Sequence, residues 1–134
     1  MKRIFIVVDD HEARRGYYDA FFQAYIVVEV VQSGELALKI LERGAEADLF
    51  LVDLDARKTL DGIDSIEFMR ITHRIERLSQ ALFVVVNEGT LEVKRQKLLE
   101  EIDVTYVPKS RNQVRDVVDK LMSGRPVRER QSKR

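Results

Sequence analysis

The sequence has 134 residues, of which 45% are hydrophobic and none is cysteine. This length suits one domain with a single core, and the lack of cysteine excludes a disulfide framework and a thiolate metal site. Lysine plus arginine and aspartate plus glutamate both total 23, so net charge does not point to nucleic acid or an anionic membrane as the main partner. No apolar run approaches the roughly 20 residues of a membrane span, and no signal peptide follows Met1. We therefore expect a soluble, cytoplasmic protein without membrane contact.

The chain begins with a strand pattern that is followed by a helix pattern. Residues 4–8 form an apolar run rich in β-branched residues, which is typical of a buried strand, and the acidic pair Asp9-Asp10 follows it. From Glu12 onward, apolar residues recur at spacings of three and four, which predicts a helix with one buried stripe. The residues of that stripe are Ala13, Tyr17, Ala20, Phe21 and Ala24.

A second strand over residues 26–31 precedes a helix for which Ser33 is the candidate N-cap and Gly44 the stop. The expected buried positions of this helix are Leu36, Ala37, Ile40 and Leu41. Residues 49–52 are all apolar, which suits a strand covered on both faces of a parallel sheet, and Asp53 ends the run. An acid at that position is a candidate for function, because ligands of open α/β sheets bind outside the carboxyl ends of the strands.

The second half of the chain continues the alternation. The loop over residues 54–62 ends in the turn dipeptide Asp61-Gly62, and we expect a helix from about Ser65. The expected buried positions of this helix are Phe68, Ile71, Ile75 and Leu78. Residues 82–86 predict a fourth strand.

The last elements complete the pattern. Residues 91–101 are mostly charged and predict a thinly anchored surface helix, and residues 104–107 predict a short fifth strand before Pro108-Lys109. A last helix, stopped by Gly124, is expected to bury Val114, Val117, Val118 and Leu121. Strand and helix thus alternate five times, which predicts an α/β fold with a parallel sheet, right-handed crossovers and helices on both faces.

Charged residues follow three of the predicted strands: Asp9 and Asp10 the first, Asp53 the third and Lys109 the fifth. In a parallel sheet these positions share one edge, where three carboxylates repel one another unless a cation compensates for their charge. A hard divalent ion such as Mg²⁺ fits, because it takes one or two carboxylates together with water and phosphate oxygens. Lys109 can pair with Asp53 or with a phosphoryl group bound there. A cluster of salt bridges that serves stability alone is the alternative.

Together these residues resemble a known family. Asp9-Asp10 after the first strand, Asp53 after the third, Asp61-Gly62 in the next loop and Tyr106-x-x-Lys109 at the fifth are similar to the receiver domain of two-component response regulators. The resemblance covers residues 1 to about 122. It implies a flavodoxin-like doubly wound fold, with five parallel strands in the order 2-1-3-4-5.

The resemblance also implies a role for each matched residue. Asp53 would accept a phosphoryl group from a histidine kinase or a phosphotransfer protein, and Lys109 would contact that group. Asp9, Asp10 and Asp53, with the backbone carbonyl of Asp55, would hold Mg²⁺. Such a domain is not an enzyme in the usual sense, because its chemistry is limited to its own Mg-dependent phosphorylation and dephosphorylation.

One departure concerns signalling. Receivers usually end the fourth strand with threonine or serine, whose hydroxyl bonds the phosphoryl group, whereas this chain has Val86 followed by Asn87. One register places Val86 at the hydroxyl position, and a shift of one residue places Asn87 there; the hydroxyl is missing in both. We expect phosphoryl transfer to survive and the coupled switching of Tyr106 to be weakened, unless Tyr106 only packs at the sheet edge.

Two other functional classes fit parts of the sequence. A pseudo-receiver would bind a partner without phosphorylation. The missing hydroxyl is the observation that favours this class. A phosphatase of the haloacid-dehalogenase type would use Asp53 as nucleophile and Asp55 as general acid, but Arg57 stands where that class has threonine.

The expected domain organisation is a receiver domain over residues 1–124 and a basic tail or linker over residues 125–134. The tail suggests nucleic acid only weakly, and a frayed solvated end is the alternative. By resemblance, a downstream protein would bind the face made by the fourth helix, fifth strand and fifth helix. The sequence leaves the oligomeric state open, a homodimer included.

Overall fold

The computed structural model describes residues 2–8, 11–31, 34–53, 65–87, 97, 99–108 and 110–124. The predicted tail over residues 125–134 lies outside them, so the proposed domain boundary stays a prediction. Within the described ranges, none of the helices is long and apolar enough to cross a membrane.

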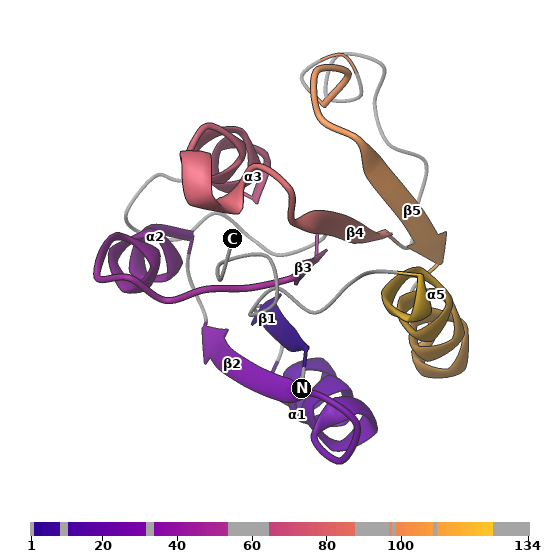
Figure 1. Cartoon of the computed structure of the whole chain (residues 1–134). Helices are drawn as coiled ribbons and strands as arrows, with labels where there is room; N and C mark the ends of the chain where they lie inside the picture. Colours follow the sequence, from indigo (N-terminus) through magenta and orange to yellow (C-terminus); the bar gives the residue numbers. More distant parts are fainter. Residues whose placement is uncertain are drawn as a thin grey trace.

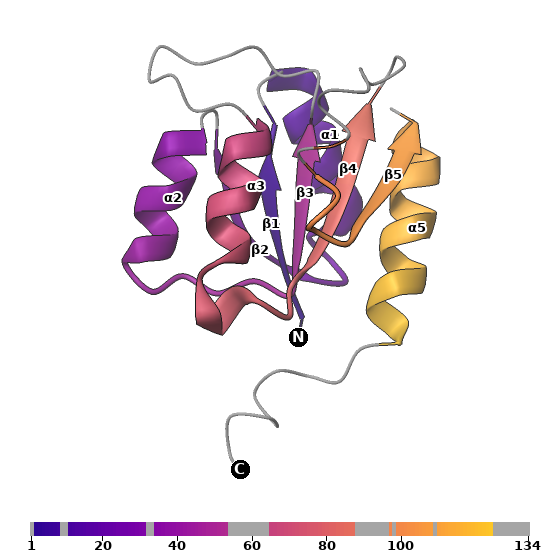
Figure 2. The ribbon, with the colours of Figure 1, turned by 90° about the horizontal axis from the view of Figure 1, so that it is seen from above.

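The apolar runs form five strands of one parallel sheet. They are β1 (Arg3–Val7), β2 (Ile26–Val31), β3 (Leu49–Asp53), β4 (Leu82–Asn87) and β5 (Val104–Pro108). Their order in the sheet is β2-β1-β3-β4-β5, with every neighbouring pair parallel (Figure 1). All strands therefore end at one edge, as the arrowheads in Figure 2 show. The predicted flavodoxin-like, doubly wound sheet is confirmed.

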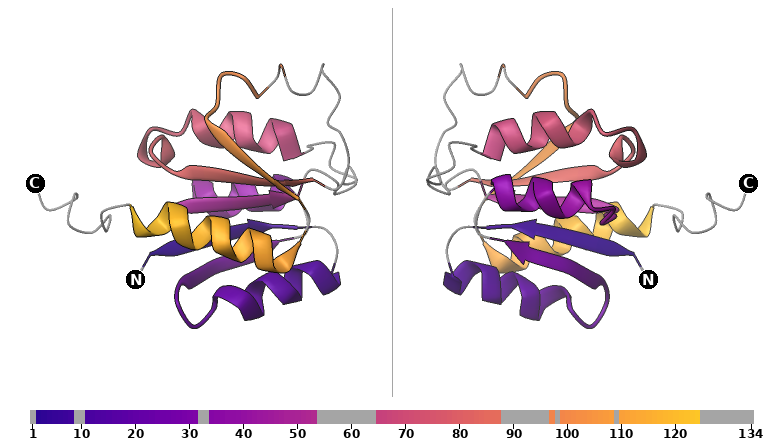
Figure 3. Two further views of the ribbon diagram at one scale, coloured as in Figure 1. Left: turned by 90° about the vertical axis from the view of Figure 1, so that its right-hand side faces the viewer. Right: turned by 90° about the vertical axis from the view of Figure 1, so that its left-hand side faces the viewer.

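Helices cover both faces of this sheet. They are α1 (His11–Phe21) and α5 (Arg111–Ser123) on one face, and α2 (Gly34–Glu42) and α3 (Ser65–His73) on the other (Figures 1 and 3). A short 3-10 helix, η1 (Glu76–Leu78), follows α3. Every residue of β3 is buried, because the strand lies at the centre of the sheet between two helical layers.

Alternate residues of the strands supply two separate cores. One core lies under α2 and α3, where the ring of Phe50 packs against the rings of Phe5, Phe68 and Phe83 with centroids 5.2–5.9 Å away. The other lies under α1 and α5. Its strand residues are Ile4, Ile6, Leu49, Leu51, Val84, Val86 and Val107, and Val8, directly after β1, joins them.

The predicted buried stripes of α2 and α3 are mostly confirmed, but one predicted position in each helix is exposed in the structure. Leu36 was expected inside α2 but is 49% exposed, and Leu38 is buried in its place. In α3, Ile71 is 42% exposed, and Ile66 and Met69 are buried. Both helices carry two overlapping apolar stripes, so spacing alone does not determine which stripe meets the sheet.

Some element ends also differ from the sequence prediction. The first helix ends at Phe21, so Ala24 lies exposed in the following turn rather than in the buried stripe. The helix of α3 ends at His73, and Leu78 reaches the core from η1. Gly44 ends α2 as expected, with a φ of 104° that favours glycine.

Candidate functional site at the carboxyl edge of the sheet

Asp53 is the last residue of β3 and is only 1% exposed. Its strand lies between β1 and β4, and the strand order reverses between β1 and β3, since β2 lies beyond β1 and later strands lie on the other side. Chain connections diverge at such a point and leave a crevice for a ligand. The fold therefore presents the carboxylate of Asp53 at the usual ligand position of an open α/β sheet.

Val86 is the neighbour of Asp53 on β4. The two residues are direct partners in the parallel register, whereas Asn87 pairs with Pro108 of β5 one position further on. Strand alternation puts Asp53 on the same face as Leu51, and Val86 packs in the core on that face with no exposed surface. The residue beside the acid is thus apolar, and the register favours Val86 over Asn87 as the residue in the hydroxyl position.

Ser65 makes a contact with Asp53 that the sequence reasoning missed. The first residue of α3, it is 9% exposed, and its Oγ donates a buried hydrogen bond of 3.0 Å to the backbone carbonyl of Asp53. In the sequence, Ser65 was only the expected start of a helix. The available signal was a hydroxyl residue at a helix start, three residues after the turn dipeptide Asp61-Gly62.

Tyr106 lies apart from Asp53. It pairs with Val85 on β4, so strand alternation directs it to the face that holds α3, opposite to that of Val86. Its side chain is 48% exposed, and partial burial raises the pKa of its hydroxyl. Tyr106 lines a surface pocket of about 400 Å³, and the other described residues that line it are Leu99, Glu100, Ile102, Asp103 and Val104.

The other predicted site residues, Asp9, Asp10, Asp55 and Lys109, lie outside the described residues. The strands that precede three of them, β1 and β5, end at the same edge as β3. In the ranges that the structure describes, no group of three or more histidine, aspartate or glutamate side chains is arranged to hold a metal ion.

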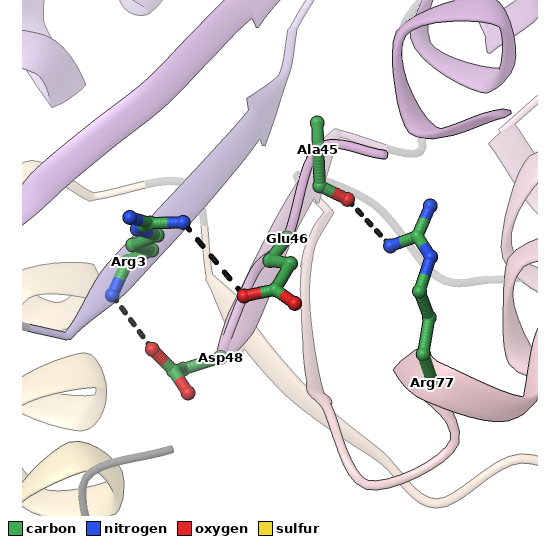
Figure 4. Close-up of polar contacts among 5 residues, drawn as sticks. All are labelled: Arg3, Ala45, Glu46, Asp48 and Arg77. Atoms are coloured by element: carbon green, nitrogen blue, oxygen red, sulfur yellow. Dashed lines mark hydrogen bonds and ion pairs between the residues drawn. The ribbon is translucent and has the colours of Figure 1, made fainter. Parts of the chain in front are cut away.

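A second acid, Asp48, precedes β3 at the opposite edge and is 3% exposed. Its Oδ2 accepts a hydrogen bond of 2.8 Å from the backbone N–H of Arg3 (Figure 4), and its own N–H donates to the Arg3 carbonyl. The carbonyl of Asp48 accepts from the N–H of Leu82. Asp48 thus aligns the starts of β1, β3 and β4, which is a structural role.

Nearby, Arg77 of η1 holds the end of α2. Its guanidinium donates to the carbonyl of Ala45 at 2.6 Å (Figure 4) and also to the carbonyl of Leu41. An arginine is well suited to such carbonyls, because the C-terminal end of a helix leaves them without helical partners. The amino edge of the sheet therefore shows contacts that stabilise the fold.

Comparison with known proteins gives structural likeness alone. No family model and no curated protein sequence matches the chain. A response regulator receiver protein from Sinorhizobium medicae WSM419 is 20% identical, with a TM-score of 0.74 over 93% of this chain and 97% of that one. The Vibrio cholerae chemotaxis protein CheY4 is 15% identical, with a TM-score of 0.74 over 90% and 98% of the two chains.

A CheY-like response regulator receiver domain from Methanospirillum hungatei JF-1 is also similar, at 20% identity and a TM-score of 0.72 over 92% of each chain. These likenesses span almost the whole of both molecules, and they agree with the strand order and the two helical layers. Sequence identities this low are evidence for the fold alone. The chain therefore has the fold of a CheY-like response regulator receiver domain.

Proposed function

We propose that this chain is a cytoplasmic phosphoacceptor module, in which Asp53 receives a phosphoryl group from a histidine kinase or a phosphotransfer protein. The observation that carries the proposal is the position of Asp53. A buried carboxylate ends the central strand at the point where the strand order reverses, in a fold shared with response regulator receivers. Asp48, the other acid that flanks β3, is bonded to main-chain groups and is used for structure.

The proposed reaction is a substitution at phosphorus. A carboxylate oxygen of Asp53 forms a bond to the phosphorus, and the P–N bond to the donor's phosphohistidine breaks. The electron pair of that bond stays on the imidazole nitrogen, which takes up a proton from solvent. Water later hydrolyses the acyl phosphate, returning the carboxylate and inorganic phosphate. No other substrate is turned over.

The residues proposed to assist are Asp9, Asp10 and Lys109, with the backbone carbonyl of Asp55. Carboxylate and carbonyl oxygens are ligands that Mg²⁺ prefers, and a charge as buried as that of Asp53 requires compensation. When bound, Mg²⁺ would neutralise charge on the phosphoryl oxygens. Lys109 would pair with Asp53 before transfer and with a phosphoryl oxygen after it.

The proposed output is the binding of a protein partner. Phosphorylation adds roughly −1.5 to −2 charge at the carboxyl edge, which is enough to bias a bistable segment. The pocket beside Tyr106 lies on the face that the receiver resemblance assigns to partners. Because Val86 offers no hydroxyl to the phosphoryl group, we expect the conformational response to be smaller than in receivers that have one.

A second function has its own supporting observation. Val86 is fully buried beside Asp53, so this position has no hydroxyl with which to bond a phosphoryl group. A pseudo-receiver binds its partner without phosphorylation and needs no hydroxyl at this position, so Val86 fits that function as well. The two functions differ in whether Asp53 gains a phosphoryl group.

The deciding experiment weighs the intact protein after incubation with Mg²⁺ and a small phosphoryl donor, acetyl phosphate or phosphoramidate. We expect the wild type to gain the mass of one phosphoryl group and Asp53→Asn to gain none. Asp116→Asn, an exposed acid on α5, is the matched control and should behave like the wild type. An unmodified wild-type mass with both donors would contradict the phosphoacceptor function and favour the pseudo-receiver.

A further inference from the structure

We propose that Ser65 is a positioning residue for phosphoryl transfer, which acts by holding the main chain of Asp53. This inference rests on the proposed phosphoacceptor function. It adds a hydroxyl on α3 to the groups that determine the reactivity of Asp53.

The contact is specific and shielded from water. The Oγ of Ser65 donates to the carbonyl oxygen of Asp53 at 3.0 Å, and the two residues are 9% and 1% exposed. A serine at the start of a helix commonly accepts a hydrogen bond from the N–H groups of its own helix. Here the hydroxyl donates instead to a strand twelve residues earlier.

The sheet holds the main chain at Asp53 through the pairing of β3 with β4. The described pairing of β1 with β3 ends at Val7 and Val52, whereas the pairing with β4 continues to Asp53 and Val86. The bond from Ser65 adds a further tether at the residue where β3 ends.

Holding the carbonyl affects the carboxylate because both groups branch from the same Cα. A fixed carbonyl limits rotation of the main chain at Asp53, and with it the direction of the Cα–Cβ bond. Nucleophilic attack depends steeply on such alignment, and a displacement of about 1 Å can cost roughly a hundredfold in rate. Ser65 therefore contributes to orienting the attacking oxygen.

The donor is on a well-anchored element. Ile66, Phe68 and Met69 are buried directly after Ser65, and the ring of Phe68 packs on that of Phe50 with centroids 5.9 Å apart. Phe50 itself lies on β3, three residues before Asp53. The strand β3 and the helix α3 therefore pack firmly against each other near this hydrogen bond. A contact that positions a reactive group needs such rigid support.

The test compares initial rates of phosphoryl gain, by intact mass with Mg²⁺ and acetyl phosphate, at a temperature where every variant is folded. We expect Ser65→Ala to react roughly tenfold more slowly than the wild type. Ser65→Thr keeps a hydroxyl and should restore the rate to within about twofold of the wild type. A rescue by threonine distinguishes positioning by the hydroxyl from a general loss of stability.

Two controls on hydroxyl loss accompany these variants. Thr72→Val removes a buried hydroxyl of α3 that has no hydrogen-bond partner among the described residues, and Ser79→Ala removes an exposed one after η1. Both should react like the wild type. A wild-type rate for Ser65→Ala, a slow Ser65→Thr, or equal slowing in Thr72→Val would overturn the role of Ser65. A wild type that gains no mass would instead overturn the proposed function, and the positioning role with it.

Discussion

Asp53 and Val86 are direct partners near the ends of the paired strands β3 and β4. They bear on two different properties of the proposed site, namely acceptance of a phosphoryl group and the conformational response to it. In the proposed function, the carboxylate of Asp53 would supply the nucleophile that accepts the phosphoryl group. The valine supplies no donor to the product, although a hydrogen bond to a charged group contributes about 1.5–3 kcal/mol. Its loss corresponds to roughly a tenfold or larger change in the bias toward an active conformation. Acceptance and switching are therefore expected to be uncoupled in this chain.

Val86→Thr tests that separation. Because Val86 is fully buried, a hydroxyl there should lower the free energy of unfolding by about 1–3 kcal/mol in the unphosphorylated protein, as measured by denaturant unfolding. Phosphorylation should then change hydrogen exchange over residues 99–108 more than in the wild type. Val84→Thr, on the same face but further from the edge, should show the stability loss alone. An equal phosphorylation response in both variants would argue against a switching role for position 86.

At the scale of elements, α3 contacts both the candidate site and the segment before β5. Ser65 at its start bonds to Asp53. Near its end, the Nε of Arg70 donates to Oε1 of Glu101 at 3.0 Å, and Arg74 lies 3.8 Å from the same oxygen. Glu101 belongs to the turn that leads into the Tyr106 pocket. One helix thus connects the region of Asp53 with the proposed partner face.

The Arg70–Glu101 contact makes a pH-dependent prediction. The hydrogen bond from Arg70 holds the pKa of Glu101 below its ordinary value of 4.5. A lowered pKa in the folded state means that the contact adds stability above pH 4.5 and loses it as the pH falls toward the folded-state pKa.

Glu101→Gln should therefore unfold at a slightly lower temperature than the wild type at neutral pH, with a smaller gap in acid. Because these side chains are largely exposed, the effect should also shrink at high salt. Thermal unfolding over a pH series measures both dependences, with the exposed Glu100→Gln as control. A gap that stays constant with pH would contradict the assignment.

At the scale of the whole molecule, the residues at the two edges of the sheet differ in their contacts. The amino edge is closed by contacts such as those of Asp48 and Arg77 with main-chain carbonyls and N–H groups. At the carboxyl edge, Asp53 shares the end of the sheet with β1, β4 and β5, which come from distant parts of the chain. A ligand that bridges these strand ends would stabilise the fold as a unit.

Mg²⁺ is the ligand for which this effect is predicted. Binding to the folded state alone raises the free energy of unfolding by about 1.4 kcal/mol when the free ion is tenfold above its dissociation constant. The unfolding temperature of the wild type should rise with Mg²⁺, and the rise should vanish in Asp9→Asn, Asp10→Asn and Asp53→Asn. Asp116→Asn should keep it. If Mg²⁺ does not change the unfolding temperature of the wild type, that result would argue against the metal site.

Local patterns were sufficient for much of the fold. Strand and helix periodicity predicted the β-α alternation, and uninterrupted apolar runs identified the buried strands because both faces of such a strand need apolar cover. The same patterns placed Asp53 at the carboxyl end of a strand, which is where open α/β sheets bind their ligands. They identified most of the buried positions of α2 and α3 but did not determine the edges of the buried stripes, since Leu36 and Leu38 both flank the buried pair Ala37 and Leu41.

Only the tertiary structure decided which residues meet. The parallel register places Val86, rather than Asn87, beside Asp53, and the docking of α3 brings Ser65 to the Asp53 carbonyl. The packing that determines these contacts joins residues far apart in the chain, so no local spacing encodes them. The sequence by itself determined that an acid ends a buried strand, because an uninterrupted apolar run is a local pattern. The surroundings of that acid depend on long-range register and helix packing, which the folded molecule alone determines.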